Sequence, residues 1–268
     1  MNKFDNFNII VISIKGLHKR KVFQKHQLGK LQLSATFMDA VTPNDLAPSV
    51  LKKYSTSWAR PLRKTEIALT HSHAKAWQHS IEINKPVLVL EDDVILCGSL
   101  PSILQSVFLR DDLEFVQLET FGEPKLLCKT PESLSIQDYR LHKLYRDRGG
   151  AAAYIIWPKT AKKLIDSVKK SYPPADAAIH LAPGIRRHQI SPACAIQAMK
   201  VPKDSIDFER VRDIAPSSVS NVSKPDYESY TQWLMHKTRR LIISLKLFKR
   251  ILAATFSGEY KKVYYTGK

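Results

Sequence analysis

The feature that most constrains the fold is residues 86–96, where an apolar run meets three consecutive carboxylates, Pro-Val-Leu-Val-Leu-Glu-Asp-Asp-Val-Ile-Leu. The run Val87–Leu90 predicts a strand buried on both faces, as in a parallel sheet. Glu91, Asp92 and Asp93 then place three negative charges at the end of that strand. A divalent cation such as Mg²⁺ or Mn²⁺ would balance them, because hard metals prefer oxygen ligands. The alternative is a solvated acidic turn, but the carboxyl ends of strands are where open α/β sheets bind ligands.

The rest of the chain predicts an α/β fold with a mostly parallel sheet, because apolar strand patterns alternate with amphipathic helix patterns. Strands are expected at residues 8–14, 34–40, 87–90, 114–119, 151–157 and 190–197, and helices at 15–31, 65–83, 100–108 and 159–170. The nine glycines form neither a G-x-G-x-x-G turn nor a G-x-x-x-x-G-K-[ST] loop. A dinucleotide-binding Rossmann site and a P-loop NTPase are therefore disfavoured. We expect one domain over residues 1–203, a linker over 204–230 and a separate segment over 231–268.

The charge of this C-terminal segment sets it apart. The chain carries a net charge of +17, and residues 231–268 hold nine Lys or Arg against one acid. Within it, apolar residues recur on one helix face and basic residues on another; the apolar ones are Leu234, Leu241, Leu245, Phe248 and Leu252. This pattern predicts a basic amphipathic helix that lies in the interface of an anionic membrane. The alternatives are a helix packed on the domain or a dimer contact.

Several sequence blocks, in order and with matching spacing over residues 8–200, resemble the bacterial lipooligosaccharide glycosyltransferases of family 25. The blocks are Val11-Ile12-Ser13-Ile14, Arg20, Phe37 to Ala40-Val41, Glu66-Ile67 with Ser72-His73 and Trp77-Gln78, Leu90-Glu91-Asp92-Asp93-Val94, Gly149-Gly150 to Tyr154-Ile155-Ile156, Pro174-Ala175-Asp176, and Pro192 with Gln197. Two pairs depart from the family pattern: Ala68-Leu69 stands for Gly-Cys, and Gly150-Ala151 for Thr-His. Donor or acceptor details are expected to differ there.

The resemblance implies a GT-A-like, single Rossmann-like domain that binds a nucleotide sugar, usually UDP-galactose or UDP-glucose. Of these we expect UDP-galactose, which would make the enzyme a beta-galactosyltransferase. It further implies Mn²⁺ or Mg²⁺ as cofactor, inversion at the anomeric carbon, and a lipid-linked oligosaccharide of the lipopolysaccharide core as acceptor. Three cysteines without a Cys-x-x-Cys pair, and no recognisable signal peptide, favour the cytosol. We therefore expect a peripheral enzyme on the cytoplasmic face of the inner membrane.

The resemblance also implies roles for individual residues. Asp93 is the expected metal ligand, with Glu91 beside it facing the metal, ribose or sugar. The expected substrate-binding residues are Ser13, Ile14, Arg20, Ala40, Ser72, His73, Glu91, Gly149, Gly150 and Gln197. For His73 the alternative is a core histidine, and for the glycines an ordinary turn.

An inverting transfer needs a general base for the acceptor hydroxyl. Asp176 is the first candidate because the rigid Pro173-Pro174 entry restricts where its carboxylate can point. Glu119, at the end of a predicted strand, is the second. For both, the alternative role is hydrogen bonding to nearby backbone.

Two other classes of function remain open from the residues alone. A basic nucleic-acid-binding protein, or a metal-dependent nuclease, would carry basic and aromatic residues interleaved across the fold. Here the basic excess is concentrated at one terminus, so we expect no nucleic-acid partner. A catalytically silent membrane adaptor gives no reason for the acidic strand end.

Overall fold

The computed structural model describes residues 7–202, 211–215 and 225–267. Its helices are α1 (His18–Lys30), α2 (Pro48–Ser55), α3 (Lys64–Glu82), α4 (Leu100–Val107), α5 (Pro158–Ser171), α6 (Ala175–Leu181) and α8 (Tyr230–Ala253), with short 3₁₀ turns η1 (Pro43–Asp45) and η2 (Ala198–Lys200). Its strands are β1 (Ile9–Ser13), β2 (Thr36–Asp39), β3 (Val87–Glu91), β4 (Val94–Leu96), β5 (Phe115–Gln117), β6 (Glu119–Thr120), β7 (Lys125–Cys128), β8 (Glu132–Ser133), β9 (Arg140–Arg146), β10 (Ala153–Ile156), β11 (Arg187–Ser191), β12 (Ala195–Gln197) and β13 (Gly258–Lys261).

The strands form one large sheet in the order β13-β7-β9-β11-β5-β10-β3-β1-β2, and a small sheet in the order β4-β12-β6. The predicted α/β class is confirmed, but the prediction of a mostly parallel sheet is wrong. β1 pairs in parallel with β2 and β3, whereas β10 lies antiparallel between β3 and β5. Parallel neighbours need a long crossover, usually a helix. The described chain between β5 and β10 forms strands instead, so β10 can run in the opposite direction.

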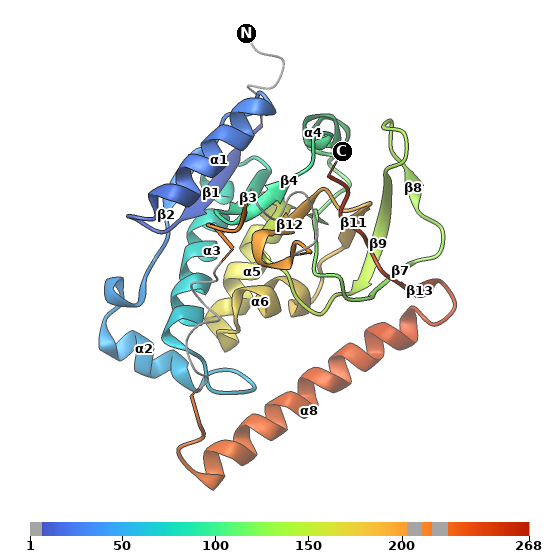
Figure 1. Cartoon of the computed structure of the whole chain (residues 1–268). Coiled ribbons are helices and arrows are strands. Elements are labelled where there is room, and N and C mark those ends of the chain that lie inside the picture. Colours follow the sequence, from blue (N-terminus) through green and yellow to red (C-terminus); the bar gives the residue numbers. More distant parts are fainter. Residues whose placement is uncertain (1–6, 203–210, 216–224, 268) are drawn as a thin grey trace.

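Helices cover both faces of the large sheet, as Figure 1 shows. Alternate residues of β3 point to opposite sides. Leu88 and Leu90 join a buried cluster with residues of α1 and α4. Val87 and Val89 join a second cluster with residues of α3, α5 and α6. This burial on both faces is what the uninterrupted apolar run predicted.

The C-terminal segment is not a separate unit. The helix predicted there is α8, which lies across the lower side of the molecule in Figure 1. β13 then pairs antiparallel with β7 and becomes an edge of the large sheet. The predicted boundary at residue 231 is therefore corrected: residues 258–261 belong to the α/β domain, because β7 offers them an open edge. Most of the linker predicted over 204–230 lies outside the described residues.

Helix α8 leaves its predicted apolar face uncovered. Leu241, Leu245, Phe248 and Leu252 are each 55–61% exposed. Its other side contacts the domain through polar groups, described below. None of the described helices combines the length and the apolarity needed to cross a bilayer.

Candidate active site

A cavity of about 400 Å³ opens at the carboxyl ends of β1 and β3, between α3, α6 and β12. Nine of the residues predicted for the site line it: Ile14, Arg20, Ala40, Ser72, Glu91, Asp93, Gly150, Asp176 and Gln197. Four others do not line it: Ser13, His73, Gly149 and Glu119. The carboxyl end of β3 is therefore the centre of the site, as the acidic run indicated.

Asp92 accepts hydrogen bonds from three donors and links the end of β1 to the acidic residues 91–93. Its carboxylate accepts hydrogen bonds from Ser13 Oγ (2.9 Å), the Ile14 backbone N–H (3.4 Å) and the Arg20 guanidinium (2.9 Å). Ser13 thus faces Asp92 instead of the cavity, and it is buried. With its oxygens occupied in this way, Asp92 has a structural role in the turn.

Asp93 differs from Asp92 because one of its oxygens has no partner. Oδ2 lies 3.7 Å from the Arg20 guanidinium, but Oδ1 is buried without a hydrogen bond to any described residue. Burial and the negative charge of Glu91 raise the pKa of Asp93 to about 7, against the opposing charge of Arg20. A buried carboxylate oxygen without a donor is costly. A cation at this point would remove that cost and restore the charged form.

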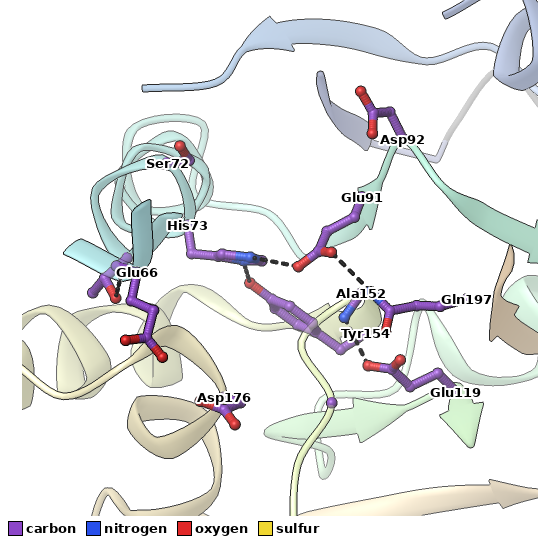
Figure 2. Close-up of polar contacts among 12 residues, drawn as sticks. Glu66, Ser72, His73, Glu91, Asp92, Glu119, Ala152, Tyr154, Asp176 and Gln197 are labelled. Atoms are coloured by element: carbon purple, nitrogen blue, oxygen red, sulfur yellow. Dashed lines mark hydrogen bonds and ion pairs between the residues drawn. The ribbon is translucent and has the colours of Figure 1, made fainter. Parts of the chain in front are cut away.

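Glu91 is held from two sides, as Figure 2 shows. His73 Nε2 donates to Oε1 (3.3 Å) and Gln197 Nε2 donates to Oε2 (3.1 Å). His73 is completely buried, and its Nδ1 lies 2.9 Å from the Tyr154 hydroxyl, which accepts a hydrogen bond from Trp77 Nε1 (2.8 Å). One arrangement satisfies every group: the Tyr154 hydroxyl donates to Nδ1, and Nε2–H donates to Glu91. His73 therefore positions Glu91 from within the core and does not contact the cavity.

Gly150 forms the floor of the cavity above Glu119. Its φ is +107°, and a Cβ there would come within 2.8 Å of Glu119 Oε1. That oxygen accepts hydrogen bonds from the Ala152 backbone N–H (2.7 Å) and Gln117 Nε2 (3.1 Å). Burial and the charge of Glu91 raise the pKa of Glu119 to about 8. Glu119 is thus enclosed, and its raised pKa favours the protonated form, which disfavours it as a general base.

Asp176 reaches the cavity from the first turn of α6. It is partly exposed, and its Oδ1 accepts a hydrogen bond from the Ala177 backbone N–H (2.7 Å). Gly149 lies against it, because a Cβ on Gly149 would be 3.7 Å from Asp176 Oδ2. Of the two candidate bases, only Asp176 faces the cavity.

An ion pair at the start of α3, between Arg60 and Glu66, was not predicted from the sequence. Arg60 donates to both oxygens of Glu66, at 2.9 and 2.5 Å, and the Arg63 backbone N–H also donates to Glu66 (2.9 Å). Burial alone would raise the pKa of Glu66, but these hydrogen bonds outweigh it and keep the pKa below its usual value. The cap residue of α3 is Arg63. Thr65, in the first turn, lines the cavity, and its buried hydroxyl has no hydrogen-bond partner among the described residues. Glu66 belongs to one of the sequence blocks that resemble the family, and this resemblance could have indicated that it has a role in the site.

No group of three or more His, Cys, Asp or Glu side chains in the described ranges is arranged to hold a metal ion unaided. Both oxygens of Glu91 already accept hydrogen bonds, so Asp93 Oδ1 is the carboxylate oxygen best suited to a cation. A metal here would need further oxygens from its ligand, such as those of a diphosphate.

The chain is similar to several known proteins. A candidate glycosyltransferase of Haemophilus influenzae (strain Rd) is 29% identical over 174 residues, which are 63% of this chain and 60% of that protein. The chain therefore spans less than two thirds of the length of this relative. Among solved structures, a glycosyltransferase involved in the glycosylation of the major capsid of PBCV-1 aligns over 77% of this chain and 98% of its own (12% identity, TM-score 0.39). A mannose-1-phosphate geranyltransferase from Thermus thermophilus aligns over 69% and 73% (10% identity, TM-score 0.37).

These structural likenesses are too low to carry a conclusion, but the family match is extensive. The model of glycosyltransferase family 25, described as an LPS biosynthesis protein, matches residues 6–179. That range includes the acidic end of β3, the helix α3 and Asp176. The chain belongs to glycosyltransferase family 25.

Proposed function

We propose that this protein transfers a hexose, galactose or glucose, from a UDP-sugar onto the oligosaccharide core of a lipopolysaccharide acceptor, with inversion at the anomeric carbon. The observation that carries the proposal is the Oδ1 atom of Asp93, which is buried at the edge of the cavity without a hydrogen-bond partner in the described part of the chain. The family match supports the class of reaction. The cavity, about 400 Å³, is within the size range of small-molecule sites.

The residues present fit a divalent cation, Mn²⁺ or Mg²⁺. Asp93 would hold it through Oδ1, with Glu91 nearby and the donor diphosphate completing the coordination. The metal would supply charge neutralisation at the departing diphosphate. Arg20 adds a fixed positive charge at the same edge, where it already contacts Asp92 and Asp93. Glu91 is oriented by His73 and Gln197 and would accept hydrogen bonds from hydroxyl groups of the donor.

Asp176 is the proposed general base. In Figure 2 its side chain lies away from Glu91 and Asp92, and it lines the cavity and is partly accessible, so an acceptor hydroxyl could approach it. It would take the proton as that hydroxyl attacks the anomeric carbon. Glu119 is enclosed beneath Gly150 and cannot reach such a hydroxyl without movement of the backbone.

Two variants separate the donor role from the base role. Asp93→Asn should remove Mn²⁺-dependent UDP binding while the fold is retained. Asp176→Asn keeps the size of the side chain but cannot accept the proton, so kcat should fall by roughly 10²–10⁴, with UDP affinity close to wild type. UDP affinity is measured by calorimetry with and without EDTA. Metal-independent transfer by Asp93→Asn, or loss of UDP binding in Asp176→Asn, would refute the respective assignment.

We further propose that the exposed apolar face of α8 rests in an anionic membrane surface. Four large apolar residues lie on that face, and the helix also carries several Lys and Arg. A peripheral position of this kind would bring the cavity close to a lipid-linked acceptor.

A further inference from the structure

Helix α8 contacts the domain at two points and leaves a space between them. Near its N-terminal end, His236 Nδ1 donates to the Trp58 carbonyl (2.6 Å), which also accepts from Arg239 (3.2 Å). Near its C-terminal end, Arg250 donates to three carbonyls at the end of α6, those of His180, Leu181 and Ala182. Arg239 and Arg250 are separated by about 16 Å of helix, at 1.5 Å per residue.

The space between these contacts is a cavity of about 550 Å³ that is rich in positive charge. Its lining includes Lys170 of α5 and, from α8, Arg239, Lys246, Lys249 and Arg250, and no Asp or Glu. The two arginines are engaged with backbone carbonyls. The three lysines form no salt bridge with any described residue. Cations gathered without an acid repel one another, so an anion bound here would be stabilised.

The same cavity has apolar walls. Ile242, Ile243 and Leu247 line it from α8, and Leu181 lines it from α6. A small inorganic anion would contact only the lysines and leave this surface hydrated. A ligand with both a phosphate and an acyl chain would satisfy both parts of the lining.

This cavity is also connected by shared residues to the active site. A second cavity, of about 240 Å³, shares Ala177, Leu181 and Leu247 with it. That second cavity shares Asp176 with the cavity at the end of β3. The three cavities are therefore neighbours, and the proposed general base Asp176 lies between the second cavity and the one at the end of β3.

We propose that the α8 cavity binds the phosphate-bearing, lipid-proximal part of an anionic glycolipid, whose saccharide extends past Leu247 toward Asp176. The role of this glycolipid as acceptor rests on the proposed function; binding of an anionic amphiphile does not. The new element is the place of binding, which the basic and apolar lining of the cavity indicates. The outer face of α8 is a different surface, turned away from the domain.

The test measures binding to the full-length protein of a monomeric amphiphile, dihexanoyl phosphatidic acid below its micellar concentration, by isothermal titration calorimetry. Lys246→Gln/Lys249→Gln removes two cavity charges. Lys237→Gln/Arg240→Gln is the matched control, because these exposed residues of the same helix do not line the cavity. Dihexanoyl phosphatidylcholine and inorganic phosphate serve as ligand controls.

We expect the cavity variant to raise the Kd for the phosphatidic acid at least tenfold, since each charge-assisted hydrogen bond contributes on that scale. The matched control should stay within about twofold of wild type. Equal losses in both variants would show a general charge effect and overturn the proposal. Absence of binding by the wild type, or equal affinity for inorganic phosphate, would overturn it too. The probe carries no sugar, so failure of glycosyl transfer with this binding intact would count only against the proposed function.

Discussion

Removal of one hydroxyl group from the core, by Tyr154→Phe, tests the buried network that orients Glu91. The hydroxyl is the partner of both His73 Nδ1 (2.9 Å) and Trp77 Nε1 (2.8 Å), and all three side chains are fully buried. Phenylalanine would fit the same space but would leave two polar atoms without a partner. The gap left by the oxygen is too small to admit a water molecule.

The expected cost follows from counting these atoms. A buried polar group left without a hydrogen bond costs about 1–3 kcal/mol. Two such groups give about 2–6 kcal/mol, a large part of the 5–15 kcal/mol typical of folded proteins. In Tyr154→Phe the hydroxyl no longer orients His73, so Glu91 should also lose its fixed position. The affinity of the folded variant for the donor should therefore fall, in addition to the loss of stability.

The free energy of unfolding is measured by urea titration followed by circular dichroism. Tyr145→Phe is the matched control, because among the described residues that hydroxyl bonds only to Ser257 Oγ (2.9 Å), in an exposed contact. We expect it to cost less than about 1 kcal/mol. A stability of Tyr154→Phe within about 0.5 kcal/mol of the wild type would refute the proposed network.

Three further predictions concern other parts of the chain. Gly150→Ala should destabilise the protein by at least about 1–3 kcal/mol, because φ is +107° and the new Cβ would contact Glu119. Gly122→Ala is the control: its φ is +77°, but its Cβ would point into open space, so only backbone strain is added. Urea titration of both variants compares their free energies of unfolding. Burial raises the pKa of Glu119 to about 8. The native state therefore keeps a proton that the unfolded chain loses from about pH 4.5 upward, so stability should fall as pH rises from about 5 to 8. In Glu119→Gln, the melting temperature should depend less on pH over that range. Leu245→Glu/Phe248→Glu should release the protein from anionic vesicles in a sedimentation assay without lowering its melting temperature, since both side chains are exposed; unchanged vesicle binding would refute the membrane role of this helix face.

The central strands and the position of the site could be predicted because their signals are local. The apolar run at Val87–Leu90 indicates a strand buried on both faces, and the helix pattern of α3 depends on neighbours three and four residues away. The acidic residues then follow directly in the sequence. Resemblance to the family added Asp176 and Gln197, which the fold brings to the same cavity.

What could not be predicted depends on contacts between distant residues. No local pattern sets the antiparallel direction of β10, which depends on the path of the chain between β5 and β10. His73 has the same sequence signature whether it lines a cavity or lies beneath it, and its burial follows from contacts with Tyr154 and Glu91. The ion pair of Arg60 with Glu66 likewise required knowledge of how the loop before α3 turns back.

The final strand of the chain has a consequence for aggregation. β13 covers β7, whose Leu126 and Leu127 are almost fully buried. A protein shortened before Gly258 would present β7 as a bare, apolar strand edge, and such edges pair readily with other chains. Truncation of the C-terminal segment should therefore produce insoluble protein even where the active site is untouched. Point substitutions on α8 avoid this outcome.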